Sequence, residues 1–121
     1  DCAATAIIPD TDASPFDSLQ PSDVARSFWA AAKLRWSSQR FLDMMSEIGW
    51  PLLPECSSQD LSNLAWASGT LRYGDERWLG ALAKSFAQHG AQHTPQAVSN
   101  MVWGVSKAVE GKKDGQGHSS A

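Results

Sequence analysis

Apolar residues recur at helical spacing along residues 19–110, and no segment alternates apolar and polar positions with a period of two. The clearest pattern surrounds Trp29, Trp66 and Trp103. Mostly apolar residues stand five, two and one positions before each of these tryptophans and two and five positions after it. Such spacing places apolar side chains on one face of a helix. The pattern predicts an amphipathic helix around each tryptophan and an all-α fold.

A second helix is predicted after each of the first two, over roughly residues 38–49 and 75–89. Gly49 and Gly90 are expected to be the C-caps of these helices, because glycine readily adopts the left-handed conformation that often follows a helix. The segments GWPLLPE and GAQHTP, which begin at these glycines, then read as turns between units.

The tryptophan-containing helices also carry start signals. Ser57 and Thr94 are expected N-caps, and Pro95 suits the first helical position because it lacks the N–H that would be unpaired there. Ser57 and Asp60 further have the spacing of a capping box. Each unit therefore reads as a helical hairpin.

The helical pattern repeats with a period of 37 residues: the three tryptophans have this spacing, and QDLSNLAWASGTL returns as QAVSNMVWGVSKA. A period of this size is typical of proteins in which stacked helical hairpins share one core. The sequence therefore predicts an α-solenoid over residues 19–110. Its units are residues 20–56, 57–92 and the half unit 93–110, after an irregular segment, residues 1–18, and before a flexible tail, residues 111–121.

The charge balance limits the classes of ligand. The net charge is −3, and residues 19–110 carry as many acidic as basic side chains. Proteins that bind nucleic acid without specificity are usually basic, so a nucleic-acid ligand would have to be held by more than charge. No apolar run is long enough to span a membrane. The chain has neither an initiator methionine nor a signal peptide, so we interpret it as a fragment or processed product.

The segments SSQDLSNLAWASGTL and TPQAVSNMVWGVSKA resemble the octotricopeptide and heptatricopeptide repeats, which occur in RNA-binding proteins of organelles, often together with a RAP domain. The first unit departs from the pattern, because Arg26 stands where the other units have Asn63 and Asn100. The resemblance implies an α-solenoid that binds organellar transcripts in the chloroplast or mitochondrion. It also implies a role in stabilising, processing or translating those transcripts.

A polar stripe recurs on the side of each first helix opposite the apolar residues, seven and three residues before the tryptophan and four after it. Amide side chains can pair with the edge of an unstacked base, and a small residue one position after each tryptophan would let a base approach. Arg26, Lys33 and Lys107 are candidates for phosphate contacts. The predicted single-stranded RNA site comprises Ser22, Arg26, Lys33, Gln59, Asn63, Thr70, Gln96, Asn100 and Lys107.

Other interpretations of the same residues stay open. A polar stripe also occurs on any solvated helix face, and Asn63 and Asn100 could instead bind a turn or a neighbouring helix. An α-solenoid could also be a scaffold for protein–protein interaction, whose concave face binds a peptide or another helical-repeat protein. The repeated tryptophans are interpreted as core residues rather than platforms for base stacking.

Nothing in the sequence indicates catalysis, so we expect no enzymatic activity, no cofactor and no metal ion. His89 and His93 are four residues apart, but Gly90 between them favours a loop over a helical metal-binding pair. Cys2 and Cys56 form no disulfide framework, which fits a reducing compartment. Cys56 precedes a helix start, where the pKa of a thiol can be lowered, but no base is near it in sequence, so an inert thiol is expected.

Overall fold

Five α-helices and one 3₁₀-helix form the part of the chain that the computed structural model describes, residues 19–89 and 93–120. Side chains are described for residues 19–89 and 93–111. These residues contain no β-strand, which confirms the predicted all-α class. The segment predicted to be irregular, residues 1–18, lies outside the described residues. The helices are α2 (Pro21–Lys33), α3 (Gln39–Gly49), η2 (Trp50–Glu55), α4 (Ser58–Thr70), α5 (Glu76–Ala87) and α6 (Pro95–Ser120).

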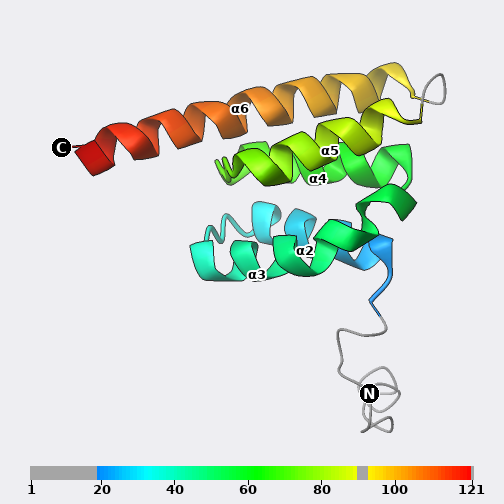
Figure 1. Cartoon of the computed structure of the whole chain (residues 1–121), viewed down its shortest axis with the longest axis horizontal. Helices are drawn as coiled ribbons and strands as arrows, with labels where there is room; N and C mark the ends of the chain where they lie inside the picture. The colour runs from blue at the N-terminus through cyan, green and yellow to red at the C-terminus, as the bar shows by residue number, and fades with distance from the viewer. Residues whose placement is uncertain (1–18, 90–92, 121) are drawn as a thin grey trace, which may run out of the picture.

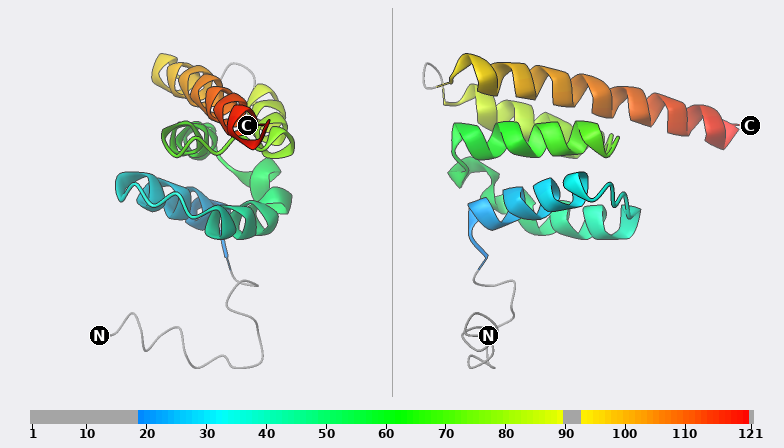
Figure 2. Two further views of the ribbon diagram at one scale, coloured as in Figure 1. Left: turned by 90° about the vertical axis from the view of Figure 1, so that its left-hand side faces the viewer. Right: turned by 180° about the vertical axis from the view of Figure 1, so that it is seen from behind.

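The helices are arranged in three layers (Figure 1). One layer is the hairpin of α2 and α3, the next is the hairpin of α4 and α5, and the last is α6, which packs mainly against α4. The right-hand view of Figure 2 shows α2, α4 and α6 one above another on the near side, with α3 and α5 behind them. The surface made by α2, α4 and α6 is called the first-helix face below.

The starts of α4 and α6 agree with the sequence. The Ser57 hydroxyl accepts a hydrogen bond from the backbone N–H of Asp60 at 3.0 Å, and Thr94 Oγ1 accepts one from Ala97 at 3.1 Å. Pro95 is the first residue of α6. Both caps bind an N–H group that has no partner within its own helix. The predicted N-caps are therefore confirmed.

The starts of α3 and α5 are capped by side chains that stand 37 residues apart, Ser38 and Asp75. Ser38 Oγ accepts a hydrogen bond from the N–H of Phe41 at 3.2 Å, and Asp75 Oδ1 accepts one from Arg77 at 2.9 Å. A carboxylate at this position also interacts favourably with the positive end of the helix dipole. Both second helices thus lie where the sequence predicts them, and α5 ends two residues earlier, at Ala87.

The end of α3 differs from the expectation. Gly49 has φ of −77°, a right-handed conformation, and η2 follows it directly, so the predicted C-cap and turn are wrong there. A Cβ atom on Gly49 would lie 2.6 Å from Cγ1 of Val24. Glycine is therefore required for the close packing of α3 on α2 rather than for a left-handed turn. Gly90, the other predicted C-cap, lies outside the described residues.

α2 and α4 both end in a Schellman motif with an arginine in the left-handed conformation: Arg35 and Arg72 each have φ of 57°. Glycine usually takes this position, because a side chain there costs roughly 1–2 kcal/mol. The apolar pattern does not predict these two helix ends, although the sequence Leu-Arg-aromatic returns there after 37 residues. The closing N–H to O hydrogen bonds are Arg35–Ala32 (3.1 Å), Trp36–Ala31 (2.8 Å), Arg72–Gly69 (3.1 Å) and Tyr73–Ser68 (2.8 Å).

Trp78 of α5 lies fully buried between the two hairpins. Its ring stacks on Phe28 of α2 with a centroid distance of 5.2 Å, and its Nε1 donates a hydrogen bond to Ser68 Oγ of α4 at 3.1 Å. Tyr73 is also buried and donates its hydroxyl to Asp43 Oδ1 of α3 at 2.8 Å. Burial raises the pKa of Tyr73 above its usual range, so the hydroxyl remains a donor. These aromatic contacts hold the two hairpins together.

The repeated tryptophans lie at the edge of the core. Trp29 and Trp103 are 45% and 42% exposed, and Trp66 is half-buried. Their interpretation as core residues is therefore wrong for Trp29 and Trp103. Successive residues of a helix point about 100° apart around its axis. The preceding Phe28 and Ala65 are thus directed into the core, and the tryptophans line depressions on the first-helix face.

α4 and α6 approach each other so closely that only glycine fits at the crossing. A Cβ atom on Gly104 would overlap the carbonyl oxygen of Ala65, and one on Gly69 would lie 2.6 Å from the carbonyl oxygen of Gly104. The small residue after each tryptophan does not leave room for a base in these two units, because Ala67 and Gly104 are buried. Their small size allows helix packing instead.

The prediction of a flexible tail over residues 111–121 is wrong up to Ser120, because α6 continues to that residue. Gly111 still packs closely on the preceding layer, where its Cβ would lie 2.5 Å from Cβ of Arg72. Once part of α6 is fixed on α4, further turns require no new nucleation, so residues with poor helix propensity can extend the helix. Neither α6 nor any other helix within the described residues is both long and apolar enough to cross a membrane.

Gly104→Ala is expected to lower the free energy of unfolding by roughly 1–3 kcal/mol, because the added methyl group meets backbone that cannot move aside. Gly80→Ala is the matched control: Gly80 lies within α5, and a Cβ there would meet no atom within 4 Å. It should gain about 0.8–1 kcal/mol from helix propensity alone. Urea unfolding followed by circular dichroism measures both, and a Gly104→Ala variant with the wild-type midpoint would contradict the close crossing.

Candidate nucleic-acid interface

All nine side chains predicted to bind RNA lie on the first-helix face, and none of them is buried. They line three open depressions between α2, α4 and α6. Side chains from distant parts of the sequence are thereby brought onto one surface. The nine residues are Ser22, Arg26 and Lys33 of α2, Gln59, Asn63 and Thr70 of α4, and Gln96, Asn100 and Lys107 of α6.

The amide depression lies between the first halves of α4 and α6 and has a volume of about 490 Å³. Its four amides are Gln59, Asn63, Gln96 and Asn100. Gln96 Nε2 donates a hydrogen bond to Asn100 Oδ1 at 3.0 Å, so this exposed pair is joined within its own helix. The amide of Asn63 makes no hydrogen bond with another side chain in the described part of the chain. Hydrogen-bond donors and acceptors from both α4 and α6 thus line one concave surface.

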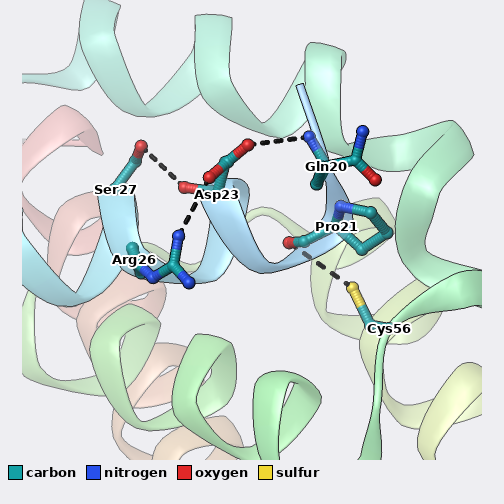
Figure 3. Close-up of polar contacts among 6 residues, drawn as sticks. All are labelled: Gln20, Pro21, Asp23, Arg26, Ser27 and Cys56. Carbon is teal, nitrogen blue, oxygen red and sulfur yellow. Dashed lines mark hydrogen bonds and ion pairs between the residues drawn. The ribbon is translucent and has the colours of Figure 1, made fainter. Parts of the chain in front are cut away.

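A smaller depression of about 220 Å³ lies between α2 and α4 and includes Ser22, Arg26, Trp29 and Asn63. Arg26 forms an ion pair with Asp23, with 3.0 Å between Nη1 and Oδ1. Figure 3 shows that the same carboxylate also accepts a hydrogen bond from the backbone N–H at the start of α2. The Arg26 side chain is largely exposed, and exposed ion pairs are weak, so it can exchange this partner for another anion.

The cationic depression, defined by Lys33, Arg35, Arg72 and Lys107, lies near the C-terminal ends of α2 and α4 and has a volume of about 500 Å³. Trp66, Trp103 and Thr70 also line it. Lys33, Thr70 and Lys107 are among the predicted residues. Arg35 and Arg72 are not, and only their 37-residue spacing could have indicated them.

Two of these four cations share one anion. Glu110 Oε1 lies 3.5 Å from Lys107 Nζ and 3.7 Å from Arg72 Nη1, and the Arg72 and Glu110 side chains are 52% and 55% exposed. Lys33 Nζ lies 5.2 Å from the centroid of the Trp29 ring, within the range of a cation–π contact. The depression therefore combines positive charge with aromatic faces, which are the two features that bind single-stranded nucleic acid.

Cys56 is buried beneath the start of α2, with its Sγ 3.9 Å from the carbonyl oxygen of Pro21 (Figure 3). Burial raises the pKa of its thiol to about 11, and the carboxylates of Asp60 and Glu55 add to the increase. A lowered pKa at a helix start is therefore excluded, and the expectation of an inert thiol agrees with the structure.

His89 and His93 lie in the connection between α5 and α6, outside both helices, as predicted. His89 Nε2 is 2.9 Å from the carbonyl oxygen of Cys56, and His93 Nδ1 is 2.7 Å from Ser58 Oγ. His93 also stacks on Phe86, with 3.6 Å between ring centroids. Within residues 19–89 and 93–111, no group of three or more His, Cys, Asp or Glu side chains could hold a metal ion. The two histidines instead fix the connection to the start of α4.

Comparisons of the chain with models of protein families, with curated proteins and with solved structures gave no match.

Cys56 is expected to resist alkylation by iodoacetamide at pH 8 in the native protein and to react in urea, because burial keeps the thiol protonated and covered. The raised pKa also predicts a loss of stability as the pH rises from about 9, the ordinary thiol value, to about 11. Above pH 9 the unfolded chain releases a proton that the folded chain still retains. The resistance of Cys56 to alkylation is measured by mass spectrometry on a Cys2→Ser background, and rapid labelling of the native protein at pH 8 would refute it.

Proposed function

We propose that this chain is a segment of an α-solenoid that binds single-stranded RNA along the first-helix face. The observation that supports this most strongly is that the nine polar residues of the repeated stripe line adjoining depressions together with exposed tryptophans. In this assignment the amide depression contacts base edges. The tryptophans stack on bases, and the cationic depression holds the phosphate backbone.

The solenoid part of the proposal is supported by features that return after 37 residues. These include the left-handed Arg35 and Arg72 and the helix caps Ser38 and Asp75. The repeats also resemble those of octotricopeptide and heptatricopeptide proteins. We therefore propose that the ligand is a chloroplast or mitochondrial transcript and that the segment acts in post-transcriptional gene expression without catalysing a reaction.

The size of the interface sets the expected affinity. Two full units and a half unit can contact two or three nucleotides, if each repeat contacts one base. Stacking contributes roughly 1–3 kcal/mol per base. A total of about 6 kcal/mol corresponds to a dissociation constant between millimolar and micromolar. The segment should therefore bind short RNA weakly, and tight binding would require additional repeats.

A protein-interaction scaffold is the second candidate function, and the surface of α6 favours it. Val98, Val102 and Val109 are exposed along this helix, with Val102 61% exposed. A partner helix could cover these side chains and bury apolar surface. In this alternative the polar residues of the first-helix face would have no effect on binding.

The double variant Asn63→Ala plus Asn100→Ala is expected to weaken RNA binding several-fold while leaving the melting temperature nearly unchanged. Both amides are partly exposed on the first-helix face, so their loss removes contacts to RNA rather than core packing. The measurement is an NMR titration at low salt with a mixed pool of short single-stranded RNA. Gln39→Ala plus Gln88→Ala is the matched control, since these exposed amides lie at α3 and α5.

Two results would contradict the proposal. If the Asn63→Ala plus Asn100→Ala variant unfolds, the amides are structural. If the folded wild-type protein shows no shifts at millimolar RNA, the first-helix face is not an RNA-binding surface, and the exposed valines of α6 become the better candidate site.

A further inference from the structure

Glu110 stands between two cations that come from different layers of the fold. Arg72 follows the end of α4, whereas Lys107 is on α6, one turn before Glu110 itself. The distances of 3.7 and 3.5 Å place both cations close enough to attract the same carboxylate oxygen. All three side chains are at least 36% exposed, so this arrangement is open to solvent. The Glu110 carboxylate therefore lies where an anionic ligand could bind the same two cations.

The cations outnumber the anion in this part of the surface. The depression is lined by Arg35, Arg72, Lys33 and Lys107, and Glu110 forms ion pairs with two of these four cations, Arg72 and Lys107. Guanidinium groups bind carboxylate and phosphate oxygens with the same donor geometry, so one anion can replace the other. Because exposed ion pairs contribute little, the carboxylate can be displaced.

The backbone gives an independent reason to assign a role to the two arginines. Arg35 and Arg72 keep a left-handed conformation at a position where glycine would be free of strain. Both side chains nevertheless line the same depression. Strained positions of this kind occur preferentially where the side chain has a function.

We propose that the cationic depression binds a phosphodiester group of single-stranded RNA and that Glu110 occupies the phosphate position in the free protein. This inference rests on the proposed function, which already places the phosphate backbone in the cationic depression, and adds the group that occupies and regulates this contact. Trp66 and Trp103 line the same depression, so a base adjoining the bound phosphate can stack on either ring. Glu110 thereby sets how strongly the depression attracts RNA.

The Glu110→Gln variant tests this assignment, because it removes the charge and keeps the shape of the side chain. Its affinity for a short single-stranded RNA at low salt should increase about three- to tenfold, and high salt should diminish the gain. Glu47→Gln is the matched control: it changes the net charge equally from the exposed face of α3 and should leave the affinity nearly unchanged. Equal gains in both variants, or weaker binding by Glu110→Gln, would overturn the role of Glu110.

A second titration with inorganic pyrophosphate separates this inference from RNA binding, with the indole N–H signals of Trp66 and Trp103 as reporters. Tighter pyrophosphate binding by Glu110→Gln supports the role of Glu110 at an anion-binding position even if neither protein binds RNA, in which case the proposed function and the RNA ligand both fail. RNA binding without any effect of Glu110→Gln on either ligand overturns this inference and leaves the proposed function intact. If neither the wild type nor Glu110→Gln binds RNA or pyrophosphate, both this inference and the proposed function are overturned.

Arg35→Gly provides a measurement in which stability and binding change in opposite directions. Glycine removes the strained conformation, so the urea midpoint should rise, and loss of the guanidinium should weaken RNA binding about two- to fivefold. Arg35→Lys keeps both the strain and the charge and should retain most of the wild-type affinity. If Arg35→Gly binds RNA as tightly as the wild type, Arg35 does not contact the phosphate backbone.

Discussion

The close crossing of α4 and α6 is the constraint on which the arrangement of the candidate interface depends. Gly104 meets the backbone of Ala65 directly, and Gly69 meets the backbone of Gly104. Because the helix backbones touch, polar side chains on either side of the crossing are brought within reach of a common ligand. α4 also contacts α2, so it is the helix through which all three members of the first-helix face are positioned. A larger residue at the crossing would separate the amides of α4 from those of α6.

The packing of the two hairpins on each other has a different structural basis. Trp78 and Tyr73 connect the two hairpins through aromatic stacking and buried hydrogen bonds, and they lie away from the polar depressions. The contacts of Trp78 and Tyr73 therefore do not depend on the nine polar side chains proposed to bind RNA. This separation lets the first-helix face carry exposed tryptophans and paired charges while the hairpins remain packed. The first-helix face also presents a locally cationic depression, although residues 19–110 carry equal numbers of acidic and basic side chains.

Periodicity made the helices, the N-caps of α4 and α6 and the polar stripe predictable, because each of these depends on residues close together in sequence. Ser57 and Thr94 cap their helices through neighbours three residues away, and the nine polar residues share a face because helical spacing puts them there. The exposure of Trp29 and Trp103 could not be predicted in the same way. It depends on which neighbouring helix covers each flank. The role of Gly49 was equally hidden, since the contact that requires it is with Val24, 25 residues away.

The same crossing also has a consequence for how a ligand would be bound. It divides the groove between α4 and α6 into an amide part that includes Asn100 and a cationic part that includes Lys107. These two residues are two helical turns apart, about 10 Å along α6. Substitutions separated by this distance without shared partners usually have additive effects. A strand bound as proposed would contact two separate subsites and pass over the glycine crossing, so the helix backbone would fix the distance between its contacts.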